Sequence, residues 1–161
     1  MNELHIDFLA DCPEYLPALA GWLHGEWGHL YPGATLETRT RALENQMRRG
    51  EIPSTLVAHQ NGIPMGTASL IASDLGTRPD MTPWLASVFV PAQCRKRGIA
   101  AQLVAAVSDA AGKLGFDRYY LWTDKEMAYY AKMGWKPLFE EQYLGKHITV
   151  MQYACITLPT P

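Results

Sequence analysis

A basic turn at residues 91–100 carries the side chains of this chain that are best suited to bind an anion. It has the sequence Pro-Ala-Gln-Cys-Arg-Lys-Arg-Gly-Ile-Ala, in which Arg95, Lys96 and Arg97 supply full positive charges. Gly98 has no side chain and therefore lets a ligand approach the backbone closely. Where such a turn opens a helix, unpaired N–H groups and the helix dipole add positive potential. We therefore expect this turn to bind phosphate.

The segments on either side of the basic turn predict a strand and a helix. Residues 84–90 are apolar on both faces, as expected for a central strand that is covered on both sides. From Ile99 to Leu114, apolar residues recur at helical spacing, which predicts an amphipathic helix. Gly112 and Gly115 weaken that helix and are expected to mark where it stops.

Two motifs resemble those of a known family. The segment 95–100, Arg-x-x-Gly-x-Ala, is similar to the coenzyme A pyrophosphate loop of the GNAT (Gcn5-related N-acetyltransferase) family, whose pattern is Gln/Arg-x-x-Gly-x-Gly/Ala. The segment 130–135, Tyr-Ala-Lys-Met-Gly-Trp, resembles the family's Tyr-x-Lys-x-Gly-Phe segment with Trp in place of Phe. Two motifs in the family's order are more specific than either one, and the resemblance covers residues 4–158.

The order of the predicted elements agrees with this resemblance. The first helix is expected to begin near Asp11 or Pro13, and the second is expected to be capped by Thr35 and to end near residues 48–50. A third helix is expected from Ile99 and a short fourth one at residues 124–133. Strands are expected at residues 4–9, 54–60, 65–72, 84–90, 117–123, 135–143 and 147–157. The resulting order β-α-α-β-β-β-α-β-α-β-β is a mixed α/β pattern. The resemblance implies a single GNAT-like domain over residues 1–161, with a mixed, splayed β-sheet flanked by helices.

The resemblance also implies where acetyl-CoA binds as a cosubstrate. Its pantetheine is expected to hydrogen-bond the backbone of the strand at residues 88–90, and its pyrophosphate is expected to meet the amides of the basic turn. A β-bulge near Phe89 would open the sheet for it. The implied cofactor-binding residues are Val88, Phe89, Val90, Arg95, Lys96, Arg97, Gly98, Ile99 and Ala100.

Tyr130 matches the family's general acid. In acetyl transfer from a thioester to an amine, the amine must lose a proton, the developing oxyanion must be stabilised and the leaving thiolate must be neutralised. A tyrosine hydroxyl has a reference pKa of about 10, not far above that of a thiol, and it can protonate the thiolate. The alternative for Tyr130 is a purely structural role in the core.

The sequence alone does not assign the general base that would remove a proton from the amine. Some members of the family use a Glu on a central strand, but residues 84–90 contain no carboxylate. Proton transfer to water is one alternative. The candidate side chains are Asp74, Asp124, Glu126, His29 and Ser87.

An aromatic segment is expected to border the acceptor pocket. In the fold that the resemblance implies, Trp27, His29 and Tyr31 face the acceptor, and their rings can clasp a cation or an aromatic amine. The alternative is packing against the first helix, which is favoured for Trp22.

Composition and charge exclude several other classes of function. Hydrophobic residues make up 48% of the 161 residues and charged residues 19%, which is typical of a globular protein with a substantial core. The formal net charge of −2 disfavours nucleic acid as a partner. No apolar run is long enough for a membrane span, and the start does not resemble a signal peptide. The histidines show no metal-ligand spacing. The few, distant cysteines favour reduced thiols in a cytoplasmic protein. We expect a monomer or a homodimer.

The sequence therefore predicts an N-acetyltransferase that moves an acetyl group from acetyl-CoA to a primary amine by direct attack in a ternary complex. The acceptor is a small molecule, a peptide N-terminus or a lysine. The first alternative is a non-catalytic acyl-CoA-binding module, because the strand carboxylate is missing. The second is a nucleic-acid-binding domain that uses the basic turn together with Arg48 and Arg49.

Overall fold

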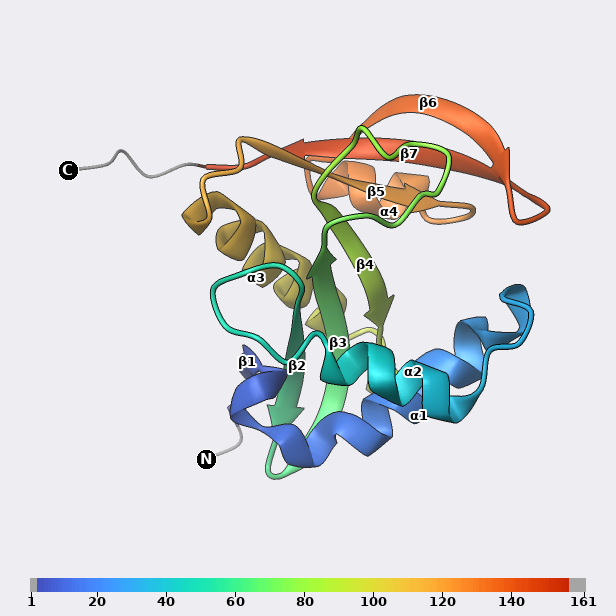
Figure 1. The fold of residues 1–161 in the computed structure, drawn as a ribbon. Helices are drawn as coiled ribbons and strands as arrows, with labels where there is room; N and C mark the ends of the chain where they lie inside the picture. The colour runs from blue at the N-terminus through green and yellow to red at the C-terminus, as the bar shows by residue number, and fades with distance from the viewer. Residues whose placement is uncertain (1–2, 157–161) are drawn as a thin grey trace.

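One mixed seven-stranded sheet forms the centre of the computed structural model, which describes residues 3–156 (Figure 1). The strands are β1 (His5–Phe8), β2 (Ser54–Gln60), β3 (Ile63–Ile71), β4 (Trp84–Phe89), β5 (Arg118–Thr123), β6 (Lys136–Tyr143) and β7 (Lys146–Ala154). They lie in the order β1-β2-β3-β4-β5-β7-β6, and only the β4–β5 pair is parallel among these neighbours. The helices are α1 (Leu16–Trp27), α2 (Leu36–Glu44), α3 (Ile99–Lys113) and α4 (Met127–Lys132). The predicted fold class and order of elements are confirmed.

The helices cover both faces of the sheet (Figure 1). On one face, Leu103 and Val107 of α3 pack in a core cluster with Leu56 of β2 and Leu70 of β3. On the other face, α1 and α2 pack against Val57 of β2. This alternation of neighbouring β2 residues between two cores is the consequence of strand geometry, in which successive side chains point to opposite faces.

Most local signals in the sequence produce the expected elements. Pro17 lies in the first turn of α1, where its missing N–H costs nothing. Thr35 caps α2, with its hydroxyl oxygen accepting from the Thr38 amide at 3.1 Å. Asn61 and Gly62 have φ angles of 53° and 76°, as a tight hairpin between β2 and β3 requires.

Several predicted boundaries are wrong. Helix α1 continues to Trp27, so that the aromatic segment begins inside the helix. Helix α2 ends at Glu44 and not near residues 48–50, because Gln46 is already hydrogen-bonded to Thr55 of β2 through its main-chain carbonyl and its side chain. Strand β7 ends at Ala154, and residue 157 of the predicted strand lies outside the described residues.

The sequence predicts that Gly112 helps to mark the end of α3, but this glycine lies inside the helix. A Cβ atom at this position would be 2.5 Å from the main-chain oxygen of Ile156, so the glycine allows the chain after β7 to pack on the helix. The helix ends near Gly115, which adopts a φ of +92°.

Strands β4 and β5 diverge after a single pair of residues. Their parallel register contains Trp84 opposite Tyr120 and no further pair among the described residues. Within β4, Ser87 has a φ of 56°, and the register with β3 skips a residue between Ala86 and Phe89. This β-bulge, at Ser87 and next to the predicted position, turns the end of β4 away from β5 and opens the sheet (Figure 1).

Candidate functional site

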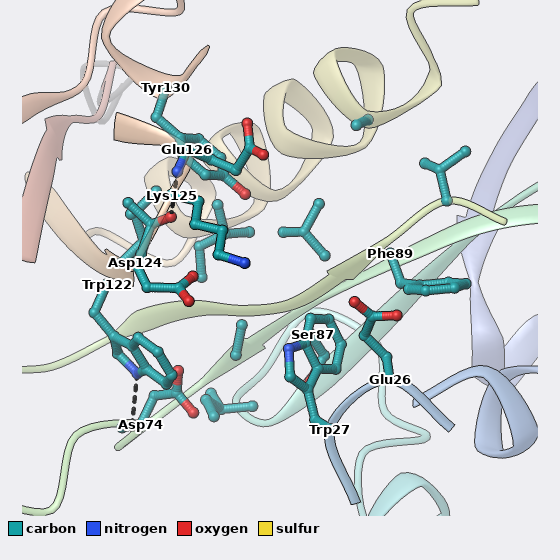
Figure 2. Close-up of a pocket in the computed structure, with 18 of the residues that line it drawn as sticks. Glu26, Trp27, Asp74, Ser87, Phe89, Trp122, Asp124, Lys125, Glu126 and Tyr130 are labelled. Atoms are coloured by element: carbon teal, nitrogen blue, oxygen red, sulfur yellow. Dashed lines mark hydrogen bonds between the residues drawn. The ribbon is translucent and has the colours of Figure 1, made fainter. Parts of the chain in front are cut away.

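A cleft of about 1220 Å³ lies where β4 and β5 separate (Figure 2). Its walls come from the end of α1, from α2, from β4, from the start of α3, and from β5 with the segment that leads into α4. Pockets for one small ligand usually measure about 300–1,000 Å³. The cleft therefore has room for a long ligand and for a second, smaller one beside it.

The end of β4 forms one wall of the cleft. Ser87, Val88 and Phe89 are half-buried and line it, and Val90 follows them. Because β5 has diverged, the β4 edge that faces the cleft has no strand partner beyond Trp84 among residues 3–156. Its N–H and C=O groups are therefore available to an extended ligand.

The basic turn closes one end of the cleft. After the short 3₁₀ helix η4 (Ala92–Cys94), Lys96 and Gly98 adopt φ angles of 65° and 76°. Left-handed residues in such a turn direct neighbouring backbone N–H groups into a concave anion site. A Cβ atom at Gly98 would meet nothing within 4 Å, so the space beside this residue is open. Helix α3 begins directly after it, and Ile99 and Ala100 line the cleft.

The three basic side chains of the turn have different surroundings. The Arg95 Nε atom donates to the carbonyl oxygen of Val90 at 2.9 Å, and its guanidinium lies over the ring of Phe89. Lys96 is exposed and lines the cleft. Arg97 donates to the carbonyl oxygen of Gln93 at 3.3 Å and lies outside the lining. Arg95 is therefore the side chain that joins the turn to β4.

Tyr130 lies on α4 and lines the cleft beside Glu126 (Figure 2). Its ring packs edge-on against Trp135, with 6.2 Å between centroids, and against Tyr129. Burial, with the nearby charges of Tyr129 and Glu126, raises the pKa of Tyr130 well above its usual value. The hydroxyl therefore stays protonated at all ordinary pH values. It is therefore available as a hydrogen-bond donor at these pH values, but it is a weaker acid than the unperturbed pKa used in the sequence prediction implies.

The aromatic segment forms the opposite wall. Trp27 packs edge-on against Phe89 of β4, with 6.2 Å between ring centroids. His29, in the short 3₁₀ helix η3 (Gly28–Leu30), and Tyr31 are exposed at the rim of the cleft. Trp22 packs on Phe89 and on the core cluster under α1, in agreement with the structural role expected for it. The cleft thus contains all three residues that the sequence assigned to the acceptor pocket.

Asp74 and Trp122 meet on the side of the cleft that faces Glu26 and Trp27 (Figure 2). The indole Nε1 of Trp122 donates to the main-chain oxygen of Asp74 at 3.0 Å. Burial raises the pKa of the Asp74 carboxyl from 3.8 to about 7, although Trp122 and Arg39 oppose the shift. Sequence reasoning included Asp74 among the candidate bases, but it placed Trp122 only in a strand and did not single out Arg39.

Neither a metal site nor a membrane-spanning helix is found in the described part of the chain. No group of three or more His, Cys, Asp or Glu side chains in residues 3–156 is placed to hold a metal ion. Within the same residues, no helix has the length and apolar character needed to cross a membrane.

Comparisons with known proteins agree with this geometry. A family model described as acetyltransferase (GNAT) family matches residues 16–135. No curated protein matches the chain by sequence.

Solved structures share the fold along nearly the whole chain. An aminoglycoside 6'-acetyltransferase type Ii superposes with a TM-score of 0.75 and 19% identity, over 96% of this chain and 99% of that one. An aminoglycoside 6'-N-acetyltransferase complexed with coenzyme A has a TM-score of 0.75 and 17% identity, over 97% and 99%. The yncA protein from Salmonella typhimurium, solved with its cofactor acetyl-CoA, has a TM-score of 0.71 and 18% identity, over 98% and 97%.

Proposed function

Because this chain belongs to the acetyltransferase (GNAT) family, we propose that it transfers an acetyl group from acetyl-CoA to a primary amine that binds in the same cleft. The observation that carries the proposal is the opening between β4 and β5, which is lined both by the basic turn and by aromatic and acidic side chains. An anionic, extended ligand fits the basic turn and the free edge of β4, and a cationic amine fits the aromatic and acidic side chains.

The residues of the cleft fit acetyl-CoA. The open space beside Gly98, the left-handed turn and the first amides of α3 match a pyrophosphate. Lys96 supplies charge to it from the lining of the cleft, and Arg97 from the outer side of the turn. The free edge of β4 at residues 88–90 matches the amides of a pantetheine arm. When bound, acetyl-CoA supplies the thioester that is the acyl donor.

The protein groups then act on the reacting atoms. The backbone amides of β4 after the bulge are placed to stabilise the oxyanion that forms when the amine attacks. Tyr130 holds a proton at its hydroxyl for the leaving sulfur, first as a hydrogen-bond donor and then as the acid. Both substrates are bound together, because β4 forms a wall shared by the two parts of the cleft.

The acceptor is a small molecule or a peptide amine. Trp27, His29 and Tyr31 present ring faces and edges to it, and the carboxylates of Glu26 and Asp74 favour a cation. Two proteins of similar fold are aminoglycoside acetyltransferases, so a panel of acceptors should include amines of that class.

The second candidate is an acyl-CoA-binding module without catalysis. It is favoured by one observation, the absence of a carboxylate in residues 84–90. A module of this kind would bind acetyl-CoA through the basic turn and release no thiol when amines are added.

Release of the CoA thiol in the presence of a panel of amines tests the proposal. Acetyl-CoA should raise the melting temperature through preferential binding to the native state. Small polyamines, aminoglycosides, amino acid amides and lysine peptides should be compared as acceptors, with mass spectrometry of the acetylated product. Binding of acetyl-CoA without turnover of any amine would favour the non-catalytic module instead.

A further inference from the structure

Asp74 follows β3 on the acceptor side of the cleft, and we propose that it is the general base that removes a proton from the acceptor amine. This inference rests on the proposed function, since it assigns a residue to that reaction. It places the base on a different element from β4, where the sequence search found no carboxylate. The fold anchors the backbone of Asp74 at the wall of the cleft, whereas the other candidate bases are ion-paired, exposed or not basic.

The segment around Asp74 is fixed at several points. Its main-chain oxygen accepts the Trp122 Nε1–H at 3.0 Å, across a sequence separation of 48 residues. Trp122 is held in turn by an edge-on contact with Tyr143, with 5.5 Å between ring centroids. The next residue, Leu75, is fully buried and packs with Trp84 in a core cluster. The carboxylate is therefore carried by an anchored backbone at the wall of the cleft.

The surroundings of the Asp74 carboxyl suit proton transfer near neutral pH. The charged and titratable groups close to it are Arg39 of α2, Tyr31 after η3 and, near Tyr31, Tyr143 of β6. Burial outweighs the effect of Arg39, and the pKa of Asp74 rises to about 7. A carboxylate with an ordinary pKa is a poor acceptor for a proton from an ammonium group, whereas a base with a pKa near the working pH is much better matched.

The other candidates are less well placed. Asp124 forms an ion pair with Lys146, with 3.2 Å between the two atoms. Glu126 is exposed and lies near Tyr129 and Tyr130, whose pKa values its charge helps to raise, so it belongs to the sulfur end of the cleft.

His29 and Ser87 also differ from Asp74. His29 is exposed at the rim of the cleft. Ser87 offers a hydroxyl, which is not basic at neutral pH, and its backbone forms the bulge of β4. Among the candidates, Asp74 alone combines a partly buried carboxyl, an anchored backbone and a place on the acceptor side.

The step balances without a further reactant. The acceptor ammonium gives one proton to the Asp74 carboxylate, and the neutral nitrogen attacks the thioester carbonyl, so that a C–N bond forms. When the C–S bond breaks, the Tyr130 hydroxyl gives its proton to the sulfur. The nitrogen then loses a second proton, which restores the hydroxyl of Tyr130. The products are the amide, the CoA thiol and the proton on Asp74, which passes to water.

The test uses Asp74→Asn and Asp74→Glu in the full chain, with Asp124→Asn as the matched control. Steady-state rates should be measured from pH 5.5 to pH 9 with an acceptor that the wild-type protein acetylates, together with the Kd for acetyl-CoA. For Asp74→Asn, we expect kcat to fall on the order of 10²-fold with an unchanged Kd for acetyl-CoA. In the wild-type protein, kcat should rise with pH and level off, with a midpoint near pH 7. In Asp74→Asn, kcat should instead keep rising with pH and show no such midpoint. Asp74→Glu should recover part of the rate and keep a limb.

Three outcomes would count against the inference. If Asp74→Asn keeps kcat and the limb but raises KM, Asp74 binds the ammonium group and is not the base. If Asp124→Asn loses the limb instead, the base is Asp124. If the wild-type protein binds acetyl-CoA but acetylates no amine, the proposed function itself is wrong and this inference falls with it, a result distinct from the first two.

Discussion

The Nε atom of Arg95 donates to the carbonyl oxygen of Val90 at 2.9 Å, which links the basic turn to the end of β4. The same guanidinium lies 5.9 Å from the centre of the Phe89 ring. One side chain therefore connects the two parts of the proposed acetyl-CoA site, the anion-binding turn and the free strand edge. Its position implies a role in orientation in addition to charge.

Arg95→Ala should weaken acetyl-CoA binding more than Arg97→Ala does. Both variants remove one positive charge from the turn, but only Arg95 contacts β4, whereas Arg97 donates to Gln93 within the turn. Loss of a charge-assisted hydrogen bond together with the charge should raise the Kd for acetyl-CoA roughly tenfold. Titration calorimetry of both variants checks the difference. Equal effects would mean that Arg95 contributes only its charge.

Gly98→Ala should weaken acetyl-CoA binding, and Gly115→Ala is its matched control. Both glycines have positive φ angles and open space around the site of a Cβ atom, one before α3 and one after it. Each substitution should cost about 1 kcal/mol of folding free energy, because alanine is strained in the left-handed region. Only the methyl group at residue 98 would occupy the space that a phosphate needs. Thermal shifts with and without acetyl-CoA separate the two effects, and a similar loss of binding in both would disprove a specific cradle at Gly98.

Asp74→Asn should make the protein more stable at pH 8 than the wild type. The folded pKa of Asp74, about 7, lies above its ordinary value of 3.8, so the folded state binds more protons between about pH 4 and pH 7. The wild-type protein therefore loses stability as the pH rises through that window, and an amide has no such dependence. Urea unfolding at pH 5 and pH 8 should show an advantage of the variant that grows with pH.

Asp80→Asn gives a control of opposite sign. The pKa of Asp80 is lowered by its hydrogen bonds with Arg78, so ionisation of this group favours the folded state above its ordinary pKa. This substitution should slightly lower stability at both pH values, since the pair is exposed. An identical pH profile for Asp74→Asn and wild type would mean that the Asp74 carboxyl titrates normally.

The basic turn could be predicted from the sequence because its signals are local. The charges, Gly98 and the onset of helical periodicity at Ile99 are contiguous, and the structure places them at the junction of β4 and α3 as expected. The hairpin at Asn61 and Gly62 is another local signal of this kind. In both places, the conformation depends on a few neighbouring residues and very little on the rest of the chain.

Other features of the site depend on contacts between distant residues. The bulge at Ser87 puts a non-glycine residue in the left-handed region, and nothing in the neighbouring sequence marks it; it follows from the way β4 pairs with β3 on one side and leaves β5 on the other. The surroundings of Asp74 likewise include Trp122, which anchors its main-chain oxygen, and Arg39, both of which are far from it in the sequence. For this reason the sequence alone could include Asp74 among several candidate bases but could not show that it is better placed than the others.

Tyr130→Phe should lower kcat on the order of 10²-fold while the Kd for acetyl-CoA changes little. The phenyl ring keeps the edge-on contact with Trp135, and only the hydroxyl that faces the cleft is lost. The loss should appear in kcat more than in KM, since the hydroxyl acts on the sulfur as its bond to carbon breaks. Because burial raises the pKa of Tyr130, the wild-type rate should show no descending limb from this group up to pH 10.

Tyr129→Phe is the control for this prediction, because Tyr129 is the more exposed neighbour and packs on the ring of Tyr130. It should be nearly silent in kcat. If Tyr129→Phe loses activity and Tyr130→Phe does not, the match to the family motif is off by one residue. If both variants keep the full rate, the sulfur takes its proton from water, and the role of Tyr130 is to pack against Trp135 and close the end of the cleft.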